Sequence, residues 1–102
     1  MRVLFNSRQK HDYLNDALAL LSGWTREGEQ IRRTLALDDT QHAALTERVA
    51  VVADALRLRP EISRRAGRTQ IRVGHGDGDP LTEGEVLLAA RIEDAVRAVT
   101  AP

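Results

Sequence analysis

The chain has no cysteine, no excess of charge of either sign and no long apolar run. Without cysteine there is no disulfide, thiolate nucleophile or thiolate metal site, which is typical of a cytoplasmic protein. A formal net charge of +0 over 102 residues leaves no overall positive field to attract nucleic acid or anionic lipid. No apolar stretch approaches the roughly 20 residues of a membrane span, and the N-terminus lacks a signal-peptide core. We therefore expect one cytoplasmic domain over residues 1–102, with a small core that self-association would supplement.

Three stretches have the three- and four-residue apolar spacing of amphipathic helices. The first covers residues 7–21. The second runs from Asp38 to Arg59, with a capping box between Asp38 and Gln41, and stops because Pro60 disfavours helical backbone in the residue before it. The third begins at the capping box Thr82-Glu83-Gly84-Glu85. The predicted inner face of the second helix consists of Leu45, Val49, Val52, Ala53 and Leu56, and Ala50 and Val51 broaden it. The predicted inner face of the third helix consists of Leu88, Ile92, Ala95 and Val99.

Two β-hairpins lie between these helices. Residues 24–26 and 30–37 flank a turn at Gly28, and residues 61–65 and 69–74 flank a turn at Ala66-Gly67-Arg68. On the last strand, alternation should place Ile71 and Val73 on one side and Gln70 and Arg72 on the other. The predicted fold is α+β, a four-stranded antiparallel sheet with three helices packed on one face, in the order α-β-β-α-β-β-α. The other face of the sheet would be exposed or used for a partner.

A group of arginines surrounds the second hairpin: Arg57, Arg59, Arg64, Arg65, Arg68 and Arg72. Guanidinium groups bind phosphate or carboxylate in a fork, so the group could form an anion site. The alternative is a solvated strand face whose charges discourage edge-to-edge aggregation, and charge runs usually have this explanation.

The glycine-rich loop 74–80 contains His75, Asp77 and Asp79. Pro80 falls where a calcium loop would need further ligands, so a Gly- and Asp-rich turn explains this composition better than a metal site, and we predict neither metal nor cofactor. His75 could also be a general acid or base, a role that histidine commonly fills. His42 and His11 have polar neighbours and are predicted to lie on the surface, and Trp24 is predicted to fill the core.

Five short motifs, in order, resemble the pterin-4a-carbinolamine dehydratase family over nearly the whole chain. They are Gly23-Trp24, Arg48-Val49-Ala50, Ala53-Asp54, Leu81-Thr82-Glu83-Gly84-Glu85 and Leu88-Ala89-Ala90-Arg91-Ile92-Glu93. The resemblance implies the fold described above and dehydration of 4a-hydroxytetrahydrobiopterin by histidines. It also implies oligomers, and a second role in transcriptional coactivation or enzyme assembly for some members.

The chain departs from this family at the residues that the resemblance makes catalytic. Two adjacent histidines precede the proline in the family, and Leu58 and Arg59 stand there in this sequence. A third family histidine aligns with Gly76, one residue after His75, and Asp77 aligns with an acidic position. Asp54 is a further position of the family site. Loss of water from a carbinolamine needs an acid and a base; Leu58 can be neither, and Arg59 stays charged.

These differences from the family favour a binding or assembly module with low or no catalytic activity. We expect it to form a homodimer or homotetramer and to bind a protein partner. The alternative is an active dehydratase on a pterin or another anionic small molecule, with Arg59 anchoring the ligand and His75 and Asp77 moving protons. Nucleic-acid binding through the hairpin arginines is a weaker third hypothesis.

Overall fold

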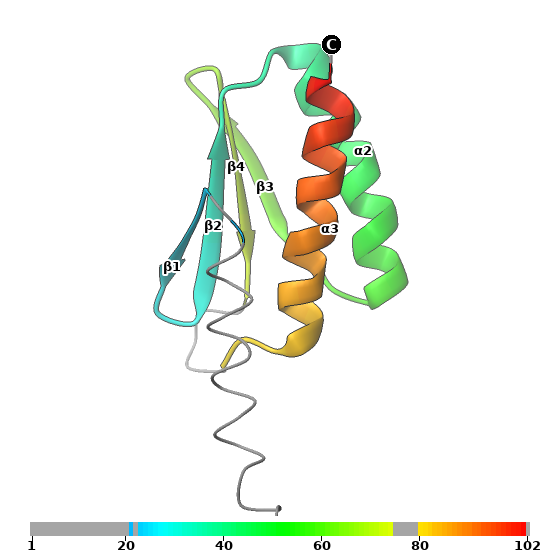
Figure 1. Ribbon diagram of the computed structural model, residues 1–102. Helices are drawn as coiled ribbons and strands as arrows, with labels where there is room; N and C mark the ends of the chain where they lie inside the picture. Colours follow the sequence, from blue (N-terminus) through cyan, green and yellow to red (C-terminus); the bar gives the residue numbers. More distant parts are fainter. Residues whose placement is uncertain (1–20, 22, 75–79, 102) are drawn as a thin grey trace, which may run out of the picture.

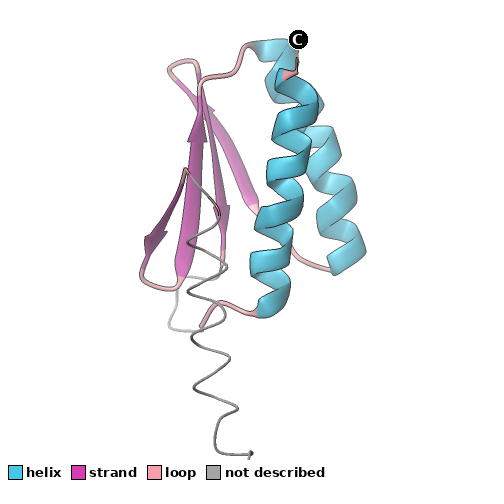
Figure 2. Ribbon diagram, viewed as in Figure 1, coloured by secondary structure: helices cyan, strands magenta, loops and turns pink. Residues whose placement is uncertain are grey.

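A computed structural model describes residues 21, 23–74 and 80–101. In this part of the chain, one antiparallel sheet carries two helices on the same face (Figures 1 and 2). The elements in chain order are β1 Trp24–Glu27, β2 Gln30–Leu35, α2 Asp39–Leu56, β3 Glu61–Arg65, β4 Arg68–Val73 and α3 Glu83–Thr100. The α+β class and the four-stranded antiparallel sheet are confirmed. Apart from Leu21, the helix predicted for residues 7–21 lies outside the described residues, which show the order β-β-α-β-β-α.

The strands are arranged in the order β1-β2-β4-β3, so that the two hairpins meet through β2 and β4. Ile31 lies opposite Val73, and Arg33 opposite Ile71, in this central pairing. Ile71 and Val73 are buried against the helices, as their alternation with exposed Arg72 predicts. The boundaries differ by one or two residues from prediction, because β2 ends at Leu35 and the second turn is only Ala66-Gly67.

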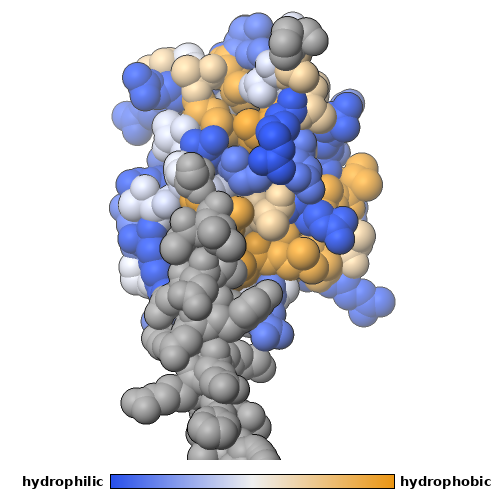
Figure 3. Space-filling view, in the orientation of Figure 1, coloured by the Kyte–Doolittle hydropathy of each residue, from blue (hydrophilic) through white to orange (hydrophobic). Residues whose placement is uncertain are grey.

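The core lies between the sheet and the paired helices. Its completely buried large side chains include Leu45 from α2, Leu88 and Ile92 from α3, and Ile31 and Ile71 from the sheet. Both predicted capping boxes are present, Asp38 with Gln41 and Thr82 with Glu85. The predicted broadening of the inner face of α2 is wrong: Ala50 is exposed and Val51 is 71% exposed, so neither side chain is part of the buried core. Figure 3 shows hydrophobic surface on the helical side and hydrophilic residues over the β1 edge.

The helix α2 ends at Leu56, three residues before the predicted stop at Arg59. Arg57 adopts left-handed backbone, with φ 57° and ψ 41°. Its amide donates to the carbonyls of Ala53 and Asp54, and the amide of Leu58 donates to the carbonyl of Ala53 at 2.9 Å. These hydrogen bonds satisfy the last carbonyls of the helix, so the helix ends at Leu56 and its end does not depend on Pro60. Residues 57–60 therefore form a connection rather than a last helical turn.

The turn of the second hairpin contains an alanine at positive φ. Ala66 has φ 53° and Gly67 has φ 76°, which is the backbone of a two-residue turn that favours Asn-Gly. Left-handed backbone costs an ordinary L-residue about 1–2 kcal/mol, and asparagine tolerates it better. We expect Ala66→Asn to raise the free energy of unfolding by about 0.5–1 kcal/mol in urea denaturation. Ala55→Asn, at an exposed helical position, should lower it because asparagine is the poorer helix former; a gain at both positions would contradict this explanation.

Candidate functional site

The connection from Arg57 to Pro60 lies where the C-terminus of α2, the end of β4 and the start of α3 meet. Leu58 packs partly buried against the core, and Arg59 is exposed. A methyl group added at Gly84 would lie 3.9 Å from Leu58 Cδ1, so the leucine side chain reaches the first turn of α3. The two residues thus place an aliphatic group inward and a guanidinium group outward at the same point of the fold.

Two hollows adjoin this connection and share Leu58, Arg59 and Pro60. The first has a volume of about 340 Å³ and is lined by Arg57, Leu58, Arg59, Pro60, Val73, Gly74, Glu85 and Leu88. The second, about 440 Å³, lies along α2 and is lined by Thr46, Val49, Ala50, Ala53, Asp54, Leu58, Arg59, Pro60 and Ile62. Among the residues that the structure describes, Arg59 is therefore the one cation that borders both hollows.

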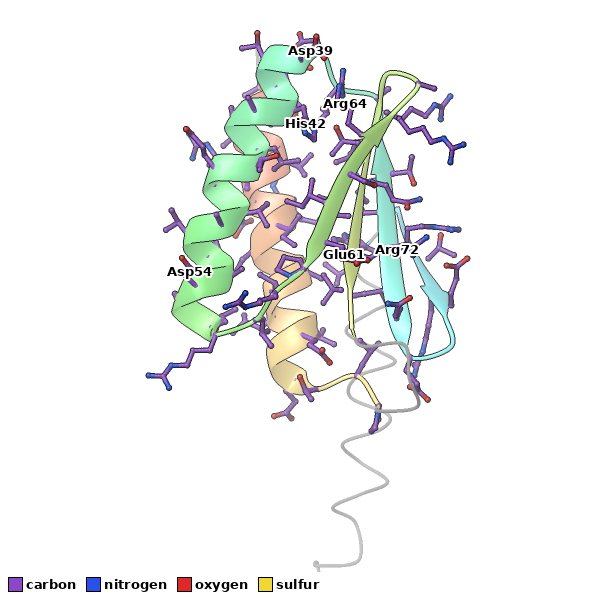
Figure 4. The ribbon with its side chains drawn as sticks, turned by 180° about the vertical axis from the view of Figure 1, so that it is seen from behind. Asp39, His42, Asp54, Glu61, Arg64 and Arg72 are labelled. Carbon is purple, nitrogen blue, oxygen red and sulfur yellow. The ribbon has the colours of Figure 1, made fainter. Side chains whose placement is uncertain are left out.

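The polar groups around the hollows have contrasting environments. The side chains of Arg57 and Arg59 are exposed and make no hydrogen bond or ion pair within the described part of the chain. Glu85 is only 3% exposed, and its carboxylate accepts a hydrogen bond from the Thr82 amide at 2.9 Å. Asp54 is exposed on the last turn of α2 (Figure 4). Unpaired guanidinium groups beside apolar walls can bind the anionic or carbonyl end of a flat ligand.

The structure brings together three of the predicted site residues, Asp54, Leu58 and Arg59, around the second hollow. His75 and Asp77 lie outside the described residues, so their position relative to this site stays a prediction. Gly74, the residue before His75, lines the first hollow. Among residues 21, 23–74 and 80–101, no group of three His, Cys, Asp or Glu side chains could hold a metal ion. Within the same residues, no helix is both long and apolar enough to cross a membrane.

His42 does not lie free on the surface as predicted. Its Nδ1 is 2.8 Å from the hydroxyl of the fully buried Thr69, which also accepts a hydrogen bond from Arg64 at 3.2 Å. Arg64 in turn donates to Asp39 at 3.0 Å and to the carbonyl of Leu37 at 2.8 Å. Figure 4 shows this cluster at the opposite end of α2 from Asp54. The sequence spacing could have predicted this inward position, because residue 42 precedes the buried Leu45 and Val49 by three and seven positions and so lies on the same face of the helix.

Comparison with known proteins defines the class. The family described as pterin 4 alpha carbinolamine dehydratase matches residues 7–95. Relatives from Roseiflexus castenholzii and Mycobacteroides abscessus, each named "Putative pterin-4-alpha-carbinolamine dehydratase", are both 32% identical. The first match covers 94% of this chain and 100% of the relative, and the second covers 83% and 92%. A transcriptional coactivator/pterin dehydratase from Brucella melitensis has the same fold, with a TM-score of 0.72 at 22% identity over 81% of this chain and 92% of that one.

The chain therefore belongs to the pterin 4 alpha carbinolamine dehydratase family.

Proposed function

We propose that this protein is a dehydratase-fold binding module, in which the hollows around Arg59 hold a pterin or another anionic small molecule with little or no dehydration. The observation that carries the proposal is the pair Leu58 and Arg59 at the junction of the two hollows. A hydrocarbon side chain cannot transfer a proton, and a guanidinium group that stays charged at neutral pH is a poor proton shuttle. The two hollows offer room for a ligand, and neither Leu58 nor Arg59 is a suitable proton donor or acceptor for one.

His42, the one histidine among the described residues, does not supply the missing proton donor or acceptor. His42 lies fourteen residues before the end of α2 at Leu56, about 21 Å along the helix axis at 1.5 Å per residue. Its ring nitrogen is also engaged with Thr69. Proton transfer needs a group within about 3 Å of the reacting atom, or one water further away. His42 is thus too distant to serve a ligand beside Arg59.

The second candidate is an active 4a-hydroxytetrahydrobiopterin dehydratase that uses His75 and Asp77 for proton transfer and Arg59 for anchoring. Its support is Gly74, which lines the same hollow as Arg59 and directly precedes His75. The two proposed functions predict different rates of 4a-hydroxytetrahydrobiopterin dehydration. In an assay with freshly generated 4a-hydroxytetrahydrobiopterin, the binding module should add little turnover to that in buffer alone. Turnover equal to that of an active family member, and lost in His75→Ala, would establish the enzyme instead.

Ligand binding itself should depend on Arg59. We expect Arg59→Ala to weaken binding of pterin-6-carboxylate, followed by pterin fluorescence, about tenfold, because a charge-assisted hydrogen bond contributes about 1.5–3 kcal/mol. Arg48→Ala is the matched control, since Arg48 is exposed on α2 and lies outside both hollows. Equal affinity of the two variants would place the ligand elsewhere.

Self-association into a homodimer or homotetramer, and docking of a protein partner, belong to the same proposal. The helical side offers a surface for this. Val51 on α2 is 71% exposed and Leu87 on α3 is 41% exposed, the two large hydrophobic side chains recorded as exposed among the described residues. A contiguous exposed apolar patch is typical of a contact surface, and we propose that α2 and α3 supply one around these side chains.

A further inference from the structure

The face of the sheet turned away from α2 and α3, called here the outer face, is a ladder of polar side chains. Strand register arranges these side chains in three rows across β3, β4 and β2. The middle row is uncharged and consists of Ser63, Gln70 and Thr34. The row on one side is Arg65 and Arg68, and the row on the other side is Glu61, Arg72 and Arg32.

Two of these cross-strand pairs join like charges. Arg65 lies directly opposite Arg68, and Arg32 lies directly opposite Arg72. Arg32 is neutralised by Glu27, with 3.0 Å between Nη1 and Oε2. The side chains of Arg65, Arg68 and Arg72 are exposed, and none of these side chains makes a hydrogen bond or ion pair with any other described residue. Like charges directly opposite each other destabilise a sheet, so the Arg65–Arg68 pair costs stability, whereas Arg72 also lies opposite Glu61.

Protection of a sheet edge explains only part of this charge. β3 is an edge strand, and charged residues on an edge discourage pairing with another molecule. Arg68 and Arg72 belong to β4, which is hydrogen-bonded on both sides by β2 and β3. An interior strand has no edge to protect. The two arginines on β4 therefore need another explanation.

We propose that the outer face binds an acidic, extended segment of a partner protein. A shallow hollow of about 820 Å³ lies over this surface and is lined by Thr34, Ser63, Gln70, Arg65, Arg68 and Arg72, among others. Alternate residues of a strand lie about 6.6 Å apart, so Arg68 and Arg72 are about 13 Å apart along β4. An extended peptide repeats its side chains at the same spacing, and its carboxylates can meet guanidinium groups in a fork.

The chemistry of the hollow favours this occupant over two others. Pockets for small molecules are mostly apolar, whereas charged and polar side chains dominate this one. Single-stranded nucleic acid usually stacks its bases on aromatic side chains, and none of the described residues that line the hollow is aromatic. The neighbouring Glu27 and Glu61 would also repel a continuous phosphate backbone, but a peptide can place a basic or neutral residue opposite them.

The test uses a fluorescein-labelled peptide of five Glu-Ser repeats and the full chain, with affinity measured by fluorescence anisotropy. We expect the double variant R65S/R68S to weaken binding about tenfold. The matched control is R48S/R91S, which removes the same charge from exposed helical positions outside the hollow, and should change the affinity less than twofold. Removal of the like-charge pair should also raise the melting temperature of R65S/R68S by roughly 1–5 °C, which separates lost binding from lost folding.

Three results would overturn the proposal: no binding of the peptide by the unaltered protein, equal weakening in both double variants, or tighter binding of a five-phosphate oligothymidine than of the peptide. None of these outcomes bears on Arg59 and its ligand, because Arg59 lies outside the outer-face hollow.

Discussion

Replacing Glu93 with alanine should lower the free energy of unfolding by about 2–3 kcal/mol. The carboxylate of this α3 residue accepts a hydrogen bond from the indole of Trp24 at 2.7 Å and another from Nε of Arg33 at 2.9 Å. Its side chain is 14% exposed and that of Arg33 is 21% exposed. Removing it leaves a partly buried indole N–H and guanidinium without their acceptor, and unsatisfied donors cost more than a hydrogen bond contributes.

Asp94 is a suitable control because it is the next residue and also bears a carboxylate. It is 67% exposed and pairs with Arg97 within the same helix. Exposed ion pairs of this kind contribute about 0–1 kcal/mol, so Asp94→Ala should have a small effect in the same urea denaturation experiment. Glu93→Gln should fall between the two, since an amide oxygen can still accept one of the hydrogen bonds. Equal midpoints for Glu93→Ala and Asp94→Ala would show that the first hairpin does not depend on this contact.

The same contact gives a physical reason for the Gly-Trp pair at the start of β1. Gly23 has φ 89°, and a Cβ placed there would lie 2.1 Å from Nη1 of Arg33. A Cβ would displace that guanidinium group from its place beside Glu93, and the positive φ also favours glycine. Trp24, predicted to be a core side chain, does pack partly buried against the core, and it also supplies a donor that the sequence pattern did not reveal.

Local sequence patterns were sufficient to predict most of the fold. The capping boxes at Asp38 and Thr82 depend on residues three positions apart, and the burial of Ile71 and Val73 depends on alternation along one strand. Both are properties of short segments, so the sequence alone predicts them well. The end of α2 was missed because the proline rule only sets the last residue at which a helix can stop, whereas Arg57 ends this one earlier by adopting left-handed backbone.

The polar side chains were harder to predict, because their environments depend on partners distant in sequence. His42 has polar neighbours along the chain, yet it contacts Thr69 across 27 positions. The arginines of the second hairpin were predicted as one group, but the structure separates them. Arg64 bonds to Asp39 and to the Leu37 carbonyl, Arg59 borders two hollows, and Arg68 faces the opposite side of the sheet. The candidate site at Leu58 and Arg59 came from the family resemblance rather than from any local pattern.

Restoring histidines at these two positions should therefore create dehydratase activity. We expect the double variant L58H/R59H to raise turnover of 4a-hydroxytetrahydrobiopterin at least about tenfold above the unaltered protein, since a well-placed general acid or base contributes roughly a hundredfold to ten-thousandfold. The gain should fall below that maximum, because Leu58 packs against the core and an imidazole there will not keep the same position. The measurement is the initial rate with freshly generated substrate, corrected for the rate in buffer.

The matched control is R48H/L87H, which makes the same two exchanges at exposed positions outside the hollows. It shows whether added imidazole anywhere on the surface accelerates the reaction, and its rate should equal that of the unaltered protein. A gain confined to L58H/R59H would mean that the hollows beside Arg59 still accept the substrate and that proton transfer is the step the chain lacks. Equal rates for the two double variants would mean that the site no longer holds a pterin in a reactive position, and the partner-binding role would then have to rest on other surfaces of the domain.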